Sequence, residues 1–164
     1  MPTKTDFTAE EWNVIRRAPL MAGLLVVAAS PSGPFGVLKE VFAVGETLAN
    51  VKRHGASSDL VNAIVADLSM SDPRQQSTPP DVRGKTPDEL RTVALEACRQ
   101  AAAVVEKKVA PVEAQAFKQW LVSTGHKVAE AASEGGVFGI GGTRVSEQET
   151  TALKDLASLL GVKA

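Results

Sequence analysis

Three Ser/Thr-x-x-Glu motifs constrain the fold of this chain more than any other feature of its sequence. They begin at Thr8, Thr86 and Ser146, and each precedes a run in which apolar residues recur every three or four positions. In such a capping box the hydroxyl oxygen accepts a hydrogen bond from the third amide of the helix, and the Glu carboxylate accepts one from the amide of the capping residue. The sequence therefore predicts a helix directly after each of these three residues.

The same apolar spacing predicts three further helices, over residues 34–54, 59–68 and 111–131, the second of them capped by Ser57 or Ser58. No segment alternates between apolar and polar residues over a sustained stretch, so no sheet is expected. We therefore expect an all-α fold, a single-domain bundle of about six helices. Pro19 is expected to kink or break the first helix, because proline lacks an N–H and clashes with the preceding turn.

The length of the chain is that of one domain. A chain of 164 residues can bury roughly 70% of its unfolded surface, and it needs no disulfide or metal to fold. Residues 71–85 are rich in proline and polar side chains, lack an apolar period and lie near the midpoint. We expect residues 1–164 to form one domain in which 71–85 is a mobile loop between two halves.

The most apolar run, residues 18–29, has twelve residues without a charge. A membrane-spanning helix needs about 20, so a core helix buried all round is expected instead.

The 18 basic and 19 acidic side chains give a net charge of −1, which argues against a nucleic-acid partner. A single cysteine and the lack of a recognisable secretory signal predict a cytoplasmic location.

Two segments of the chain resemble each other. Residues 28–36 and 131–139 are identical at six of nine positions, and in both places an apolar helix precedes and an amphipathic helix follows. This pattern predicts two helix–loop–helix units packed about a pseudo-twofold axis. Chance similarity in a chain rich in Ala and Gly is the alternative.

The glycine-rich segment 134–146 is the one candidate ligand site in the sequence. A divalent cation could be bound by Glu134, Glu147 and Glu149 together with loop carbonyl oxygens, because hard cations take several oxygen ligands. The structural alternative is that Glu149 caps the following helix and Glu147 interacts with its dipole. A phosphate site is less favoured, because no strand precedes the loop and it lacks Gly-Lys-Ser/Thr.

Residues 131–135, 145–149 and 153–161 together resemble the tellurite-resistance TerB-like family. The shared features are an acidic residue followed by Gly, a short loop, a Val-Ser-x-x-Glu helix start and a Leu-rich helix. The resemblance implies a repeated all-α fold, a role in stress response and divalent-cation binding by acidic residues. The first copy of the repeat carries Pro31 where the second carries Glu134.

Few side chains suit catalysis. Tyr is absent, and the two histidines have no catalytic partner at a recognisable spacing. His126 and Glu130 form a surface pair on one helix face, and Cys98 is expected to be a small buried residue. We therefore expect a non-catalytic cytoplasmic binding or interaction module without a cofactor, stress-related through the resemblance, with a protein partner or self-association. The alternative is a divalent-metal-binding protein that uses Glu134.

Overall fold

The computed structural model describes residues 2–30, 45, 48–51, 55–56, 58–70, 84–134 and 145–163, without the side chains of 132–134. Within these ranges the elements are a 3-10 helix, η1 (Lys4–Asp6), and the helices α1 (Ala9–Ala29), α3 (Asp59–Met70), α4 (Pro87–Lys108), α5 (Pro111–Glu134) and α6 (Glu147–Leu160). No strand occurs in this part of the chain, and the all-α prediction is confirmed.

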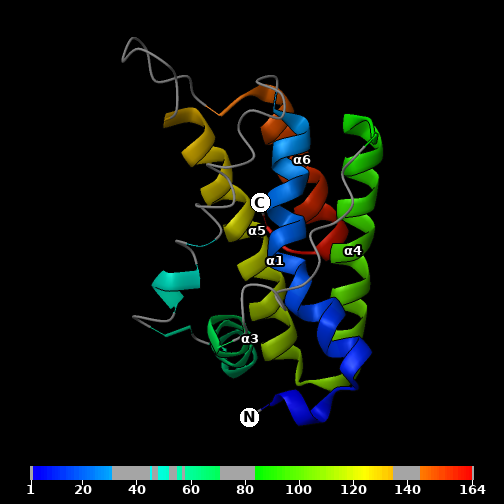
Figure 1. Cartoon of the computed structure of the whole chain (residues 1–164), viewed down its shortest axis with the longest axis vertical. Helices are drawn as coiled ribbons and strands as arrows, with labels where there is room; N and C mark the ends of the chain where they lie inside the picture. The colour runs from blue at the N-terminus through cyan, green and yellow to red at the C-terminus, as the bar shows by residue number, and fades with distance from the viewer. Residues whose placement is uncertain are drawn as a thin grey trace.

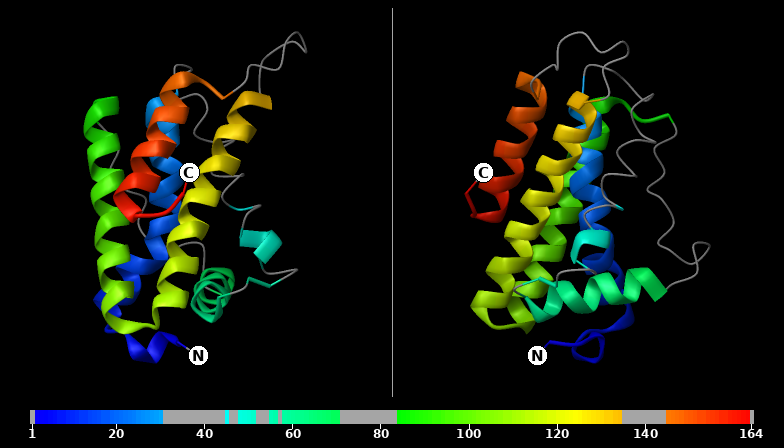
Figure 2. Two further views of the ribbon diagram at one scale, coloured as in Figure 1. Left: turned by 180° about the vertical axis from the view of Figure 1, so that it is seen from behind. Right: turned by 90° about the vertical axis from the view of Figure 1, so that its left-hand side faces the viewer.

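The long helices form a bundle. Helices α1, α4, α5 and α6 lie alongside one another, and α3 lies across them near the end where α1 begins (Figures 1 and 2). Most of the predicted helix 34–54, both loops of the predicted repeat and residues 71–83 fall outside the described ranges.

All three capping boxes form as predicted. The Glu11 carboxylate accepts a hydrogen bond from the Thr8 amide at 2.8 Å, and the Thr8 hydroxyl accepts one from the Glu11 amide at 3.2 Å. The boxes at Thr86 and Ser146 repeat this arrangement at the starts of α4 and α6. Each box satisfies amides that the first turn of a helix leaves unpaired.

Helix α1 is the most deeply placed element. Seven of residues 18–29 are buried and the other five are half-buried, so the predicted position in the core is confirmed, although one side of the helix is less deeply buried than expected. By length and apolar composition alone α1 could also cross a membrane, but 56% of its most apolar window is buried inside the bundle. The expected break at Pro19 is wrong, since α1 runs through it as one helix. Pro19 is itself buried, and packing on several sides of α1 outweighs the loss of one backbone hydrogen bond.

Close approach of three helices depends on a glycine in the middle of α5. A Cβ atom at Gly125 would lie 2.9 Å from Leu153 Cδ2 on α6 and 3.6 Å from Val26 Cγ2 on α1. The predicted apolar face of α5 surrounds this point, with Phe117, Leu121, Thr124 and Val128 all fully buried. A side chain at position 125 would therefore require the buried side chain of Leu153 to shift.

The buried face of α4 consists mainly of small residues. The buried residues are Ala94, Cys98, Ala101, Ala102 and Val105. Val93 is 39% exposed. The small residues face the bundle because they allow α4 to approach α1 closely, and the larger Val93 is left at the margin.

The C-terminal half of α3 is tied to the bundle by Asp67. Its carboxylate accepts hydrogen bonds from Lys4 Nζ at 2.8 Å, Trp12 Nε1 at 3.1 Å and Arg16 at 3.2 Å. Partial burial opposes ionisation of Asp67, but these donors outweigh it and lower its pKa. The interaction joins α3 to η1 and to the first turns of α1.

The beginning of α3 is tied to α5 by Glu113. Its carboxylate accepts hydrogen bonds from the Ser58 hydroxyl at 2.6 Å and from the amides of Leu60 and Asp59 at 3.1 and 3.3 Å. Ser58 in turn accepts from the Val61 amide at 3.1 Å, so Ser58 is the cap. Partial burial opposes ionisation of Glu113, but the hydrogen bonds outweigh it and lower its pKa.

We predict that Glu113→Gln destabilises the protein by about 1 kcal/mol or more at neutral pH, because a charged acceptor at the start of α3 becomes neutral. The folded pKa of Glu113 lies below its usual value of 4.5, so this stabilisation is complete above that pH and is lost as the pH falls through the folded pKa. Urea unfolding at neutral and acid pH measures the difference between the variant and the wild type.

Glu106→Gln is the matched control, because the Glu106 side chain is 52% exposed and water screens its ion pair with Lys118. We expect it to change the free energy of unfolding little at either pH. A difference between Glu113→Gln and wild type that does not shrink in acid would contradict the role assigned to Glu113.

Candidate functional site

Of the predicted metal ligands, Glu149 has a structural role. It is only 4% exposed, and its Oε2 accepts hydrogen bonds from the amide and the hydroxyl of Ser146, both at 2.8 Å. The structural alternative for Glu149 is thus confirmed. Binding a cation through this oxygen would require the carboxylate to leave the cap of α6.

The other two predicted ligands do not join it in a described site. Glu147 lies exposed in the first turn of α6. Glu134 is the last residue of α5, and its side chain and residues 135–144 lie outside the described structure. Among the described side chains, no group of three or more His, Cys, Asp or Glu is placed to bind a metal ion. Metal binding at 134–146 therefore stays a prediction.

Cys98 is a core residue, as predicted. It is fully buried, and its Sγ donates a weak hydrogen bond to the Ala18 carbonyl oxygen at 3.8 Å. Burial raises the pKa of the thiol to about 12. The reactive thiolate form is therefore suppressed at neutral pH. His126 is half-buried and Glu130 is exposed on α5.

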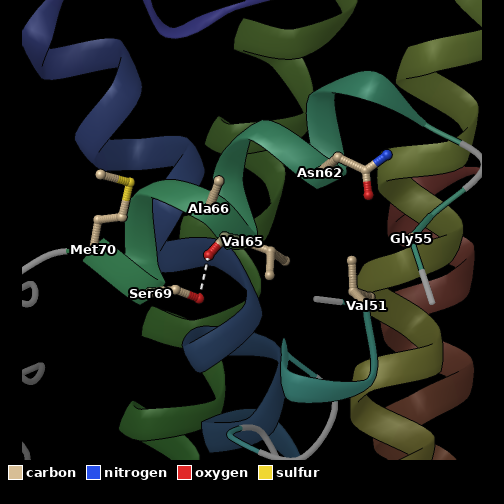
Figure 3. Close-up of a pocket in the computed structure, with 7 residues that line it drawn as sticks. All are labelled: Val51, Gly55, Asn62, Val65, Ala66, Ser69 and Met70. Atoms are coloured by element: carbon tan, nitrogen blue, oxygen red, sulfur yellow. Dashed lines mark hydrogen bonds between the residues drawn. The ribbon is translucent and has the colours of Figure 1, made fainter. Parts of the chain in front are cut away.

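A cavity beside α3 is one of two candidate binding sites among the described residues, and the sequence analysis missed it. It encloses about 310 Å³ between α3 and the segment that contains Val51 and Gly55 (Figure 3). Its other lining residues are Asn62, Val65, Ala66, Ser69 and Met70. The volume lies at the lower end of the range for small-molecule sites.

The polar groups that line this cavity already have partners. The Asn62 side chain accepts a hydrogen bond from the Ala56 amide at 2.7 Å and donates one to the Ala56 carbonyl oxygen at 3.0 Å. The Ser69 hydroxyl donates to the Val65 carbonyl oxygen at 2.8 Å, as Figure 3 shows. The cavity thus offers an occupant apolar contact, and no described lining residue is charged.

A second groove of about 310 Å³ lies between α1 and α4. Its wall contains Val14 and Met21 from α1 and Val93 and Ala97 from α4. Arg17, Lys85 and Gln100 also line it. Unlike the cavity beside α3, this groove therefore has two cationic lining residues.

No protein-family model, curated protein or solved structure matches this chain significantly. The resemblance to the TerB-like family is therefore neither supported nor contradicted by these comparisons, and it stays a prediction.

We predict that calcium, magnesium or manganese at millimolar concentration raises the melting temperature of the protein little, because the Glu149 carboxylate is engaged in the cap of α6. A cation at one hundred times its Kd would stabilise the folded protein by about 2.7 kcal/mol. Thermal unfolding of the wild type and of Glu134→Gln, with and without each ion, measures this. Stabilisation of the wild type alone would show that Glu134 is a ligand, and that the metal-binding alternative is right.

Proposed function

We propose that the protein is a non-catalytic binding module, and that the cavity beside α3 receives an apolar, uncharged group of a protein partner. The observation that carries the proposal is the lining of this cavity, where every described polar side chain is paired within the protein. An occupant gains by removing apolar surface from water, and a charged occupant would find no charged partner among the described lining residues.

Exposed apolar surface at the same place supports a protein partner. Met70 lines the cavity and is 87% exposed, and Ala66 beside it is also exposed. Methionine adapts its shape to different apolar partners and is common on binding surfaces. The partner could be another protein or a second copy of this chain, and the two are separated by the experiment below.

The use of the acidic side chains and of the cysteine supports a non-catalytic role. Glu113 and Asp67 hold α3, and Glu149 caps α6. Cys98 is buried and its pKa is raised to about 12. These groups stabilise the fold in arrangements that leave them poorly placed to transfer protons to a substrate or to attack one.

The proposal includes the cytoplasmic location and the stress-related role. A single cysteine supports the location, and the resemblance of residues 131–135 and 145–149 to the TerB-like family supports the role. Neither depends on the cavity, and each would need its own test in cells.

We predict that the neutral fluorophore N-phenyl-1-naphthylamine binds the wild type, and that Ala66→Phe weakens its binding at least about tenfold, since the ring fills the cavity. Ser158→Phe places the same ring at an exposed position of α6 away from the cavity, and it should bind like the wild type. Fluorescence titration measures the Kd, and circular dichroism checks that both variants fold.

Equal binding by Ala66→Phe and Ser158→Phe, or no binding by the wild type, would contradict the proposal for the cavity. Sedimentation of the wild type over a range of concentrations then identifies the partner. Self-association that Ala66→Phe abolishes would assign the apolar group to a second copy, whereas a monomer at all concentrations would assign it to another protein.

A further inference from the structure

We propose that the apolar group received by the cavity beside α3 is the Met70 side chain of a second copy of this chain. This inference rests on the proposed function and names the partner. Met70 of each copy would enter the cavity of the other, so a twofold-symmetric dimer would contain the same contact twice. The second copy would thus complete a site that a single copy leaves open at its surface.

The surface around the cavity carries both a projecting group and a hollow. Met70 is 87% exposed, more than any other large apolar side chain that the structure describes. It lies at the C-terminal end of α3 and is one of the residues that line the cavity (Figure 3). A twofold interface brings the same patch of two copies together, so the patch must contain both parts of the contact. Here the projecting group and one wall of the hollow lie on the same helix.

The cavity suits a methionine side chain in size and in chemistry. It encloses about 310 Å³, whereas an apolar cavity of about 150 Å³ already holds a benzene molecule. Methionine is unbranched and has three rotatable bonds, so it adapts to an irregular space. It needs no strong hydrogen-bond partner, and the polar side chains that line the cavity are already paired within the protein.

The spacing of residues along α3 places the projecting group of one copy opposite the cavity of the other. Ala66 and Ser69 line the cavity, are exposed and are small, so a second helix can approach α3 closely at this face. Asn62 lies four residues before Ala66, and Met70 lies four residues after it, on the same side of the helix. If two α3 helices cross antiparallel at Ala66, Met70 of one copy therefore faces Asn62 of the other. Asn62 lines the cavity at the end away from Met70 (Figure 3).

Charge does not oppose contact between two copies at this face. No described residue that lines the cavity is charged, so two copies can meet there without placing like charges opposite each other. The Asp67 carboxylate of α3 is engaged with Trp12 and Arg16 of α1. The net charge of the whole chain is −1, so long-range repulsion between copies is weak. Cores of protein interfaces are likewise poor in charged residues and rich in methionine.

The test is sedimentation of the full chain over a range of concentrations, and we expect a reversible equilibrium between monomer and dimer for the wild type. Met70→Gln removes the projecting group, and Ala66→Phe fills the cavity. Each should raise the dissociation constant of the dimer at least about tenfold, because each substitution acts twice in a twofold interface. Val112→Gln is the matched control, since Val112 is 74% exposed on α5 and does not line the cavity. It should leave the dissociation constant unchanged.

A mixture of the two variants tests whether the contact is reciprocal. A dimer of Met70→Gln with Ala66→Phe keeps one native contact, between Met70 of one chain and the open cavity of the other. A dimer of either variant with itself keeps none. We therefore expect the mixed dimer to have a dissociation constant at least about threefold lower than that of either variant alone. Sedimentation with a fluorescent label on one variant measures it, and circular dichroism checks that both variants fold.

The outcomes separate this inference from the proposed function. It would be overturned by a wild type that stays monomeric at all concentrations, by equal losses in Val112→Gln and Met70→Gln, or by a mixed dimer no tighter than those of the separate variants. Titration of Met70→Gln with N-phenyl-1-naphthylamine then tests the proposed function separately. Binding by this variant would leave the cavity as an apolar site for another protein, whereas no binding would contradict the proposed function as well.

Discussion

Burial of residues 18–29, the second half of α1, is the constraint on which the rest of this structure depends. Helices α3, α4, α5 and α6 all contact α1, which lies among the long helices of the bundle in Figure 1. Residues 18–29 include no exposed side chain. A central helix of this kind must be apolar around its whole circumference, so its middle cannot carry polar chemistry. Polar groups are left to the helix ends and to the outer faces, and the candidate sites lie at that periphery.

The carboxylates at the helix ends organise the elements around α1. Three of them complete the capping boxes of α1, α4 and α6, namely Glu11, Glu89 and Glu149. Two more fix the ends of α3, namely Glu113 and Asp67. Because α3 is held in this way, one face of it packs on the bundle while another borders an apolar cavity. The acidic side chains thus hold α3 in place, and none of them is among the described lining residues of the cavity. Because they serve the fold in this way, the proposed function is binding.

The sequence was most informative where structure is local. A capping box spans four residues, so the three helix starts could be predicted, as could burial of Cys98 within an Ala-rich face. The pairing of Glu113 with Ser58 joins residues 55 positions apart, and no spacing rule reveals it. Of the kink or break expected at Pro19, the break does not occur, because tertiary packing outweighs a local helix-breaking tendency. The cavity was missed because it depends on where α3 lies relative to a second segment, and the repeat loops and Glu134 side chain lie outside the described structure.

Hydrogen exchange of the native protein tests the central position of α1 most directly. A helix buried on all sides exchanges its amides only when the whole bundle opens, whereas peripheral helices can open locally. We expect the amides of residues 21–29 to be the slowest in the protein, with an opening free energy equal to that of global unfolding. If these amides exchanged through an opening of distinctly lower free energy than those of α4 and α6, α1 would not be the element on which the others depend.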